Sequence, residues 1–358
     1  MKIAVLGGGH GCHAAAADLS EQGHQVFWWR RNAAAFAGVL ASRSLTLRDS
    51  AGVRSVTIAH PTADIGEAVR NAELVLIPGP ATAHEDIARA MAPHLRDGQV
   101  VFLPPGTFGS VLMDDVARAH GSRARVSYAE TGTLPYLARK RGTGEIAITI
   151  RAVRLPTGVY PANRSADALA VIARAYPSVH ACGDALSGAL MNAGPVIHPP
   201  LILMNAGPLQ HSLTYDIHNE GTQPAVRAVT NALDAERMRL REALGYDAPH
   251  YPLADHYTSD LWMYGNAHKR LVDSGDWREH IDLHAHRYMT EDTVLGLAFL
   301  TSVARWAGVD TPVADGLLAI AGAILGKDLR SGPRTLHAMR LAGHTRAQMR
   351  ALLESGRP

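Results

Sequence analysis

The sequence predicts an α/β protein with two domains, a doubly wound parallel sheet followed by an all-helical domain. Three observations support this prediction. The chain has 358 residues, more than one compact core usually supports. In its first half, short apolar runs alternate with helical patterns, as in mostly parallel sheets. From Asp184 onward, long amphipathic segments follow one another with almost no strand signal. We expect residues 1–182 to form the first domain and residues 183–358 the second.

Short apolar runs mark the strands of the first domain. We predict strands at residues 2–6, 25–29, 74–77, 100–103 and 125–128. Residues 145–153 alternate enough between apolar and polar side chains to continue the same sheet. In the second domain, apolar residues recur at helical spacing, which predicts helices over residues 225–244, 293–307 and 313–325.

Composition and charge exclude several classes of partner. Apolar residues make up 47% of the chain and charged residues 19%, as in an ordinary globular protein. The 35 Lys and Arg residues are scattered and the formal charge is +2, so we expect no nucleic acid partner. No apolar run is long enough to span a bilayer, so we expect no membrane association. A homodimer through the helical domain is the commonest arrangement for such a chain.

The number of cysteines and the N-terminal sequence indicate the cellular compartment of the protein. The two cysteines, Cys12 and Cys182, are too few for a disulfide framework and too far apart for a zinc module. The N-terminus goes directly into an apolar run, without a basic leader followed by a cleavable apolar stretch. We therefore expect a cytoplasmic protein.

A glycine-rich turn follows the first predicted strand. The run Gly7-Gly8-Gly9-His10-Gly11-Cys12 fits the dinucleotide fingerprint at its first two glycine positions, where the turn is tight and the backbone approaches a pyrophosphate. Cys12 stands at the third position, which needs a small residue, and is a modest departure. An ordinary glycine-rich turn is the alternative. The position between the first strand and first helix favours a Rossmann-type nucleotide site that includes Gly7, Gly9, His10, Gly11 and Cys12.

The end of the second predicted strand bears on the choice of nucleotide. NAD-binding sites usually place an acid there for the ribose hydroxyls, whereas this strand ends Trp28-Trp29-Arg30-Arg31-Asn32. Guanidinium groups can chelate a ribose 2′-phosphate that an acid would repel. We therefore predict NADPH rather than NADH, held by Arg30, Arg31 and Asn32. The alternative is that both arginines are solvated surface charges.

Two further loops follow strands at the carboxyl edge of the predicted sheet. They are residues 78–81 and 104–107, and they contain Pro80, Pro105 and Gly106. In doubly wound sheets, ligands bind at this edge, so we predict that these three residues border the nicotinamide half of the nucleotide. Ordinary turns between strands and helices are the competing interpretation.

Two segments of the second domain carry a family resemblance. Residues 192–200 read Asn-Ala-Gly-Pro-Val-Ile-His-Pro-Pro, and residues 287–297 read Arg-Tyr-Met-Thr-Glu-Asp-Thr-Val-Leu-Gly-Leu. Together they resemble the opine dehydrogenase family. The similarity continues through residues 215–221, the run Asp234-Ala-Glu-Arg and the tail segment Arg334-Thr-Leu. It covers nearly the whole chain.

The resemblance implies a reaction and two catalytic residues. An amino acid or amine condenses with a 2-oxo acid such as pyruvate, and hydride from the nucleotide reduces the resulting imine. The family's catalytic histidine falls on His198 and its partner acid on Asp292. A histidine that titrates near neutrality can donate a proton in one direction and accept it in the other. Asp292 would fix the imidazole tautomer.

The residue types alone leave other interpretations open. The chain has 19 histidines, most of which must be surface or core residues. Asp292 could instead cap the apolar helix that begins near Val294. The prolines at 195, 199 and 200 predict that His198 lies on an irregular segment rather than on a helix.

Substrate carboxylates need cationic or hydrogen-bonding partners. Arg287 lies five residues before Asp292 and can bind a carboxylate with two N–H groups. Asn192 and Thr293 are lesser candidates by proximity alone. An ion pair with another helix is the alternative for Arg287.

Other chemistries remain as rivals. His280 and His284 have helical spacing that suits zinc, but no Glu follows His280, and we predict no metal site. Ketopantoate reductases and glycerol-3-phosphate dehydrogenases depend on a catalytic lysine. Beyond Lys2 the lysines are Lys140, Lys269 and Lys327, none in a recognisable segment of that type. A sensor that binds NADPH without catalysis is the rival from a different class.

Overall fold

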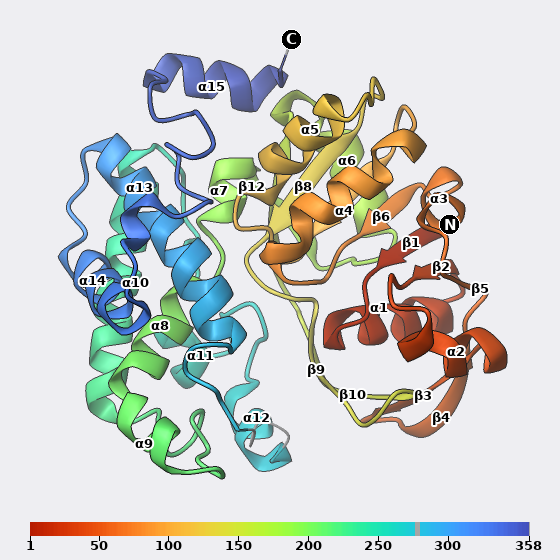
Figure 1. The fold of residues 1–358 in the computed structure, drawn as a ribbon, viewed down its shortest axis with the longest axis horizontal. Coiled ribbons are helices and arrows are strands. Elements are labelled where there is room, and N and C mark those ends of the chain that lie inside the picture. The colour runs from red at the N-terminus through yellow and green to blue at the C-terminus, as the bar shows by residue number, and fades with distance from the viewer. Residues whose placement is uncertain (276–279, 358) are drawn as a thin grey trace. The chain divides into compact units, whose positions relative to one another are not determined.

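The computed structural model describes residues 1–275 and 280–357 and divides them into two compact units (Figure 1). Unit 1 comprises Met1–Ala189 together with the C-terminal residues from Leu352, and unit 2 comprises Leu190–Ala351. The predicted fold class, a doubly wound sheet plus a helical part, is confirmed. Within the described residues, no helix has both the length and the apolar character needed to cross a membrane.

An eight-stranded sheet forms the centre of unit 1. Its strand order is β12-β11-β8-β7-β6-β1-β2-β5, and all neighbours are parallel except β11 and β8. The strands are β1 (Lys2–Leu6), β2 (Gln25–Trp29), β5 (His60–Thr62), β6 (Leu74–Leu76), β7 (Val100–Leu103), β8 (Ser127–Thr131), β11 (Leu155–Tyr160) and β12 (Val179–Asp184). The carboxyl ends of β1, β6, β7 and β8 therefore lie at one edge of the sheet.

A second, four-stranded sheet has the order β4-β3-β10-β9. Its strands are β3 (Ser44–Asp49), β4 (Gly52–Thr57), β9 (Tyr136–Lys140) and β10 (Glu145–Arg151). The prediction that residues 145–153 continue the main sheet is wrong, because β10 pairs with β3 and β9 instead. Alternating polarity identifies a strand but not its partner, since any half-buried strand shows it.

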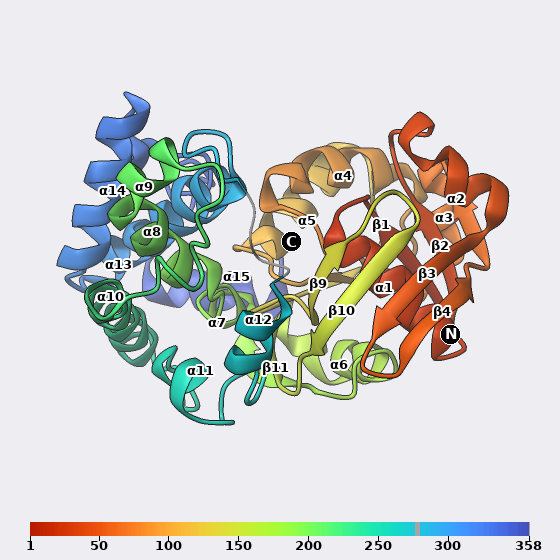
Figure 2. The ribbon, with the colours of Figure 1, turned by 90° about the horizontal axis from the view of Figure 1, so that it is seen from below.

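Helix α1 (His10–Glu21) packs against strands of both sheets. Figure 2 shows β9 and β10 passing beside α1. The four alanines at positions 14–17 are fully buried, which follows from contact with a sheet on two sides. Small side chains allow this close double packing, and the helix that opens at the glycine turn is thereby held rigidly.

Shorter helices complete unit 1. They are α2 (Ala37–Ser42), α3 (Ile65–Arg70), α4 (His84–Met91), α5 (Gly109–Ala119), α6 (Ser165–Ala173) and α7 (Ala185–Ala189), with 3₁₀ turns η1 (Ala34–Phe36), η2 (Ala81–Ala83), η3 (Ala92–His94) and η4 (Ala162–Arg164). The C-terminal end of the chain is fastened to this unit by Arg357. Its Nε and Nη2 donate to the two oxygens of Asp115 at 2.6 and 2.7 Å, and its backbone N–H donates to the hydroxyl of Tyr160.

The described residues of unit 2 form helices joined by loops and contain no strand. It contains α8 (Gly194–Met204), α9 (Ala206–His211), α10 (Pro224–Ala243), α11 (Ala254–Thr258), α12 (His268–Ser274), the π-helix η5 (Tyr288–Leu297), α13 (Ala298–Ala307), α14 (Pro312–Leu325) and the 3₁₀ turn η6 (Leu329–Ser331), and α15 (Arg346–Ser355) begins in it. The run Asp234-Ala-Glu-Arg lies on α10 and links this helix to Leu190 and to the first turn of α14. Arg237 pairs with Asp234 at 2.6 Å and donates to the carbonyl of Leu190, while Glu236 accepts the N–H groups that begin α14.

Candidate active site and nucleotide site

The glycine turn after β1 adopts a backbone conformation that requires glycine. Gly7 has φ +125°, a region that side chains rarely allow, and its carbonyl accepts the indole N–H of Trp28 at 2.9 Å. A Cβ at Gly7 would lie 2.8 Å from Sγ of Cys12. Cys12 is fully buried, and burial raises the pKa of its thiol to about 12. Cys12 therefore acts here as a neutral packing residue beneath the turn.

The rest of the turn leaves room for a ligand on one side only. A Cβ at Gly11 would crowd the carbonyl oxygen of Pro78, so α1 approaches the loop after β6 as closely as glycine permits. A Cβ at Gly9, by contrast, would meet nothing within 4 Å. The first turn of α1 contains no acid. The backbone N–H groups that begin a helix, the open space at Gly9 and the positive end of the helix dipole fit a bound pyrophosphate.

The structure separates the two arginines that follow β2. The guanidinium group of Arg30 lies across Gly8, and its Nη1 donates to the carbonyl of Ala35 at 2.7 Å. Arg31 instead forms an exposed ion pair with Asp86. The side-chain oxygen of Asn32 accepts the N–H of Ala35. Arg30 is thus the arginine that lies against the turn.

The two predicted loops lie at the carboxyl edge of the sheet. Pro80 is exposed, and Pro105 precedes Gly106, which packs against the side chain of Glu130. Glu130 is fully buried at the end of β8 and accepts the N–H groups of Phe108 and Ser110 at 2.7 and 3.2 Å, and the hydroxyl of Ser110. Glu130 was not among the predicted site residues. The signal available in the sequence was an acid just beyond the strand predicted at residues 125–128.

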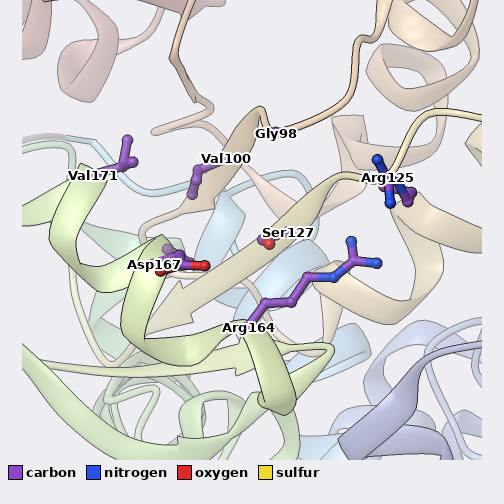
Figure 3. A pocket seen from close by; sticks show the side chains of 8 residues that line it. Gly98, Val100, Arg125, Ser127, Arg164, Asp167 and Val171 are labelled. Atoms are coloured by element: carbon purple, nitrogen blue, oxygen red, sulfur yellow. The ribbon is translucent and has the colours of Figure 1, made fainter.

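A cavity in unit 1 lies away from this edge (Figure 3). It measures about 240 Å³, and its lining includes Val100 and Ser127, the first residues of β7 and β8, together with Arg125 and Arg164. Because β7 and β8 are parallel, their first residues lie at the edge opposite the glycine turn. This cavity is not the nucleotide site.

In unit 2, His198 and Asp292 form a buried pair. Nδ1 of His198 and Oδ2 of Asp292 are 2.7 Å apart, and the two side chains are 16% and 3% exposed. Asp292 lies within η5 and does not cap a later helix. An ionised carboxylate can only accept a hydrogen bond, so Nδ1 carries the proton and Nε2 is left to exchange one.

The prediction that His198 lies on an irregular segment is wrong. His198 is on helix α8, which contains Pro199 and Pro200. Pro195 lies in the first turn of α8. Backbone N–H groups in a first turn have no hydrogen-bond partner within the helix, so a proline there costs no helical hydrogen bond. The other two prolines forgo two hydrogen bonds, and the packing of α8 against η5 and α10 holds the helix together. Local sequence rules could not reveal that tertiary support.

Two glycines bring α8 and η5 into close contact. A Cβ at Gly194 would collide with Oδ1 of Asp292, and a Cβ at Gly296 would collide with the ring of Pro195. Gly194 begins α8, so Oδ1 of Asp292 lies at the positive end of that helix. The helix dipole favours the ionised carboxylate there. Both glycines belong to the segments that carry the family resemblance.

Two aromatic neighbours of His198, Tyr288 and His218, were not predicted from the sequence. The ring of Tyr288 stacks on the imidazole, with ring centres 3.6 Å apart and planes inclined by 10°. The hydroxyl of Tyr288 is 2.7 Å from Nε2 of His218. The loop that carries His218 is held by Asn205, which accepts the hydroxyl of Tyr215 and donates to the carbonyls of Leu201 and Gly221. Tyr288 stood in a quoted segment, but no spacing rule assigns a stacking role.

The three predicted substrate residues lie near this pair in different settings. Arg287 precedes η5, is 44% exposed and pairs with Glu291 on the same helix at 3.2 Å. Asn192 is buried and accepts the N–H of Gly194. Thr293 is fully buried, and its hydroxyl donates to the carbonyl of Tyr288. Arg287 is therefore the predicted substrate residue that presents charge to solvent.

Electrostatics favour a neutral His198 beside an ionised Asp292. Burial lowers the pKa of His198, the charge of Asp292 offsets part of that effect, and Arg287 and His286 add to the lowering. Burial alone would raise the pKa of Asp292, but its interactions with His198 and Arg287 lower that pKa overall. Among the described residues, no group of three or more His, Cys, Asp or Glu side chains is placed to hold a metal ion.

Comparison with known proteins adds evidence on the family. Residues 181–325 match the α-helical domain of NAD/NADP octopine/nopaline dehydrogenases, and residues 2–106 match the N-terminus of NAD-dependent glycerol-3-phosphate dehydrogenase. An opine dehydrogenase of Arthrobacter sp. (strain 1C) is 29% identical, with 98% of each chain covered.

Solved structures show the same fold. Octopine dehydrogenase with NADH and L-arginine superposes with a TM-score of 0.73 at 21% identity, covering 99% of this chain and 98% of that one. A yersinopine dehydrogenase with NADP⁺ bound gives a TM-score of 0.67 at 18% identity, with the same coverage. The chain is therefore similar along nearly its whole length to opine dehydrogenases, and its helical part matches the α-helical domain of that family. This similarity supports an NAD(P)-dependent oxidoreductase of CH–NH bonds that reductively condenses an amino acid with a keto acid.

Proposed function

We propose that this protein uses NADPH to join an amino acid or amine to a 2-oxo acid such as pyruvate, with His198 and Asp292 as the proton-transfer pair. The observation that carries the proposal is the 2.7 Å contact between Nδ1 of His198 and Asp292, because it leaves Nε2 free to exchange a proton. The low pKa of His198 supports a neutral imidazole before substrate binds.

The proposed role of His198 has two proton transfers. Neutral Nε2 first accepts a proton from the substrate ammonium group, so that the amine can attack the carbonyl carbon of the 2-oxo acid. As the C–N bond forms, a second proton passes from the attacking nitrogen to the former carbonyl oxygen and converts it to a hydroxyl group. The imidazolium, stabilised by Asp292, then donates its proton to this hydroxyl group, the C–O bond breaks and water leaves. An iminium group remains. When bound, the nicotinamide supplies the hydride that reduces it.

Substitution at the pair tests this role. His198→Ala should lower kcat by about 10²–10⁴-fold, the usual contribution of general acid–base catalysis, while the Kd for NADPH stays within about twofold. Asp292→Asn should show the same pattern with a smaller loss. If either variant lost NADPH binding, the assignment to proton transfer would be wrong.

Arg287 is the proposed partner of the substrate carboxylates. Its exposed guanidinium can form two parallel hydrogen bonds with a carboxylate while Nε stays near Glu291. Asn192 and Thr293 are proposed as lesser contacts. Arg287→Lys keeps the charge but loses the bidentate geometry, so the KM for the 2-oxo acid should rise about 10-fold or more. An unchanged KM would assign the carboxylate to another group.

The proposed preference for NADPH depends on Arg30. Its guanidinium lies against the glycine turn, at the end of β2 where the adenosine ribose would lie. The nucleotide site further includes Gly7, Gly9, His10, Gly11 and Cys12 at the turn, Arg31 and Asn32 after β2, and Pro80, Pro105 and Gly106 in the two loops. Arg30→Asp should weaken NADPH binding about 10–100-fold and leave NADH within a fewfold. Equal weakening of both nucleotides would contradict the preference.

The decrease in absorbance as the reduced nicotinamide is oxidised tests the reaction itself. NADPH oxidation should require both a 2-oxo acid and an amine, tested as a panel with each partner also supplied alone, and should be slower with NADH. Oxidation with the 2-oxo acid alone would indicate a hydroxy-acid dehydrogenase, as in the ketopantoate reductase type. Tight NADPH binding without turnover on any pair would indicate a sensor.

A further inference from the structure

Lys140 ends β9, the edge strand of the smaller sheet. Side chains alternate between the two faces of a strand, so Lys140 shares a face with Tyr136 and Ala138. Both of those residues are buried in the core that includes the alanines of α1. Lys140 therefore lies on the side of β9 that faces α1, although it is far from the glycine turn in sequence.

A hydrogen bond joins the end of β9 to the beginning of α1. The backbone N–H of Lys140 donates to Nδ1 of His10 at 2.9 Å, and His10 is the first residue of α1. The ring of His10 thus holds Lys140 beside the glycine turn. This contact gives a physical reason for a histidine at that position of the turn.

The cations at this place lack anionic partners. Within residues 1–275 and 280–357, the ammonium of Lys140 forms no hydrogen bond or ion pair, and the guanidinium of Arg30 bonds only to the carbonyl of Ala35. Burial lowers the pKa of Lys140, and the nearby positive charge of Arg30 lowers it further. The first turn of α1 supplies no acid. Two mutually repelling cations next to a helix N-terminus form a site for a doubly charged anion.

We propose that Lys140 and Arg30 bind the ribose 2′-phosphate together, one from each sheet of unit 1, with Lys140 determining specificity for NADPH. A phosphate monoester carries close to two negative charges at neutral pH, enough to balance both cations. The pyrophosphate of the nucleotide is matched instead by the backbone N–H groups of the turn. This inference rests on the proposed use of NADPH and adds a residue that the end of β2 alone does not reveal.

Nucleotide titrations without substrate test the inference. In Lys140→Gln, we expect the Kd for NADPH to rise about 10-fold, as for loss of one charge-assisted contact, and the Kd for NADH to stay within about twofold. Binding of 2′-AMP should weaken likewise, and that of 5′-AMP should not. Lys2→Gln is the matched control, because Lys2 is an exposed lysine at the opposite end of β1, and it should change none of these values.

Stability distinguishes this role from a structural one. Because Lys140 and Arg30 repel each other in the free protein, Lys140→Gln should leave the unfolding midpoint unchanged or raise it. Equal weakening of NADPH and NADH, unchanged NADPH binding, or a lower midpoint would each overturn the assignment of Lys140. If the native protein bound NADPH no more tightly than NADH, the proposed cofactor preference would fail first, whereas a native preference that survives Lys140→Gln refutes the lysine assignment alone.

Discussion

Charged and polar groups around His198 decide when it carries a proton. Asp292, Arg287, His286, Tyr288 and His218 surround it, and burial holds its pKa below the ordinary value of about 6.5. The imidazole is therefore neutral at pH 7 and becomes protonated only on acidification below about pH 6.5. Oxidation of the secondary amine, the reverse reaction, needs the neutral form as a base.

This protonation predicts a pH profile. For oxidation, kcat/KM should be level above about pH 6.5 and fall as the pH is lowered through the pKa of His198. Asp292→Asn removes the charge that raises this pKa, so the falling limb should move to lower pH. Initial rates between pH 4.5 and 9 give the profile. A limb that moved to higher pH in Asp292→Asn would contradict the electrostatic account.

Tyr288 should act through its ring. Tyr288→Phe keeps the stack on His198 and loses the bond to His218, so we expect kcat to fall less than about 10-fold; Tyr288→Leu removes the stack, and kcat should fall about 10–100-fold with NADPH binding unchanged. Steady-state rates and nucleotide titrations separate the two effects. If Tyr288→Phe were as damaging as His198→Ala, the hydroxyl itself would be a proton donor.

The family resemblance assigned His198 and Asp292, residues 94 positions apart, to one site, and the structure brings their side chains into contact. Their catalytic role stays a prediction. Nothing local connects His218 to Tyr288 or Glu130 to the N-terminus of α5, because these contacts depend on side-chain directions that only the folded chain sets. The two arginines after β2 looked equivalent in sequence, yet only Arg30 lies on the turn.

At the scale of elements, the site depends on how α8 and η5 meet. Apolar periodicity predicted a helix over residues 293–307, whereas η5 begins at Tyr288 and winds as a π-helix through Leu297. Such wide turns are rare and gather at functional sites, and sequence periodicity cannot distinguish them from α-helix. The prolines of α8 predicted an irregular segment, and this prediction failed for a related reason. Packing of the helix outweighed the local tendency of proline to break it.

Glycine at position 296 should be required for this packing. In Gly296→Ala, the added methyl group meets the ring of Pro195, so we expect a loss of about 1–3 kcal/mol of stability and a fall in kcat, because α8 carries His198. Gly316→Ala, at a helix position with nothing within 4 Å, is the control and should stabilise by about 0.5–1 kcal/mol. Denaturant unfolding measures the change in stability, and steady-state kinetics measure the change in kcat. Equal behaviour of the two variants would contradict the close contact.

At the scale of the whole molecule, the chain divides into a nucleotide unit and a helical unit. Alternating strands and helices predicted the first and amphipathic segments the second. The second sheet of unit 1 and the return of the chain to unit 1 through Arg357 were not predicted, because both depend on pairing between distant segments. The match of residues 2–106 to glycerol-3-phosphate dehydrogenase concerns the nucleotide unit alone. The reaction assignment therefore depends on the helical unit.

The most direct test of reductive condensation is transfer of deuterium from NADPH labelled at the transferable C4 position. With a 2-oxo acid and an amine together, mass spectrometry should find a secondary amine that carries one deuterium on the former carbonyl carbon, and His198→Ala should form it far more slowly. Either substrate alone should give no deuterated product. A deuterated 2-hydroxy acid, formed with or without the amine, would contradict the account.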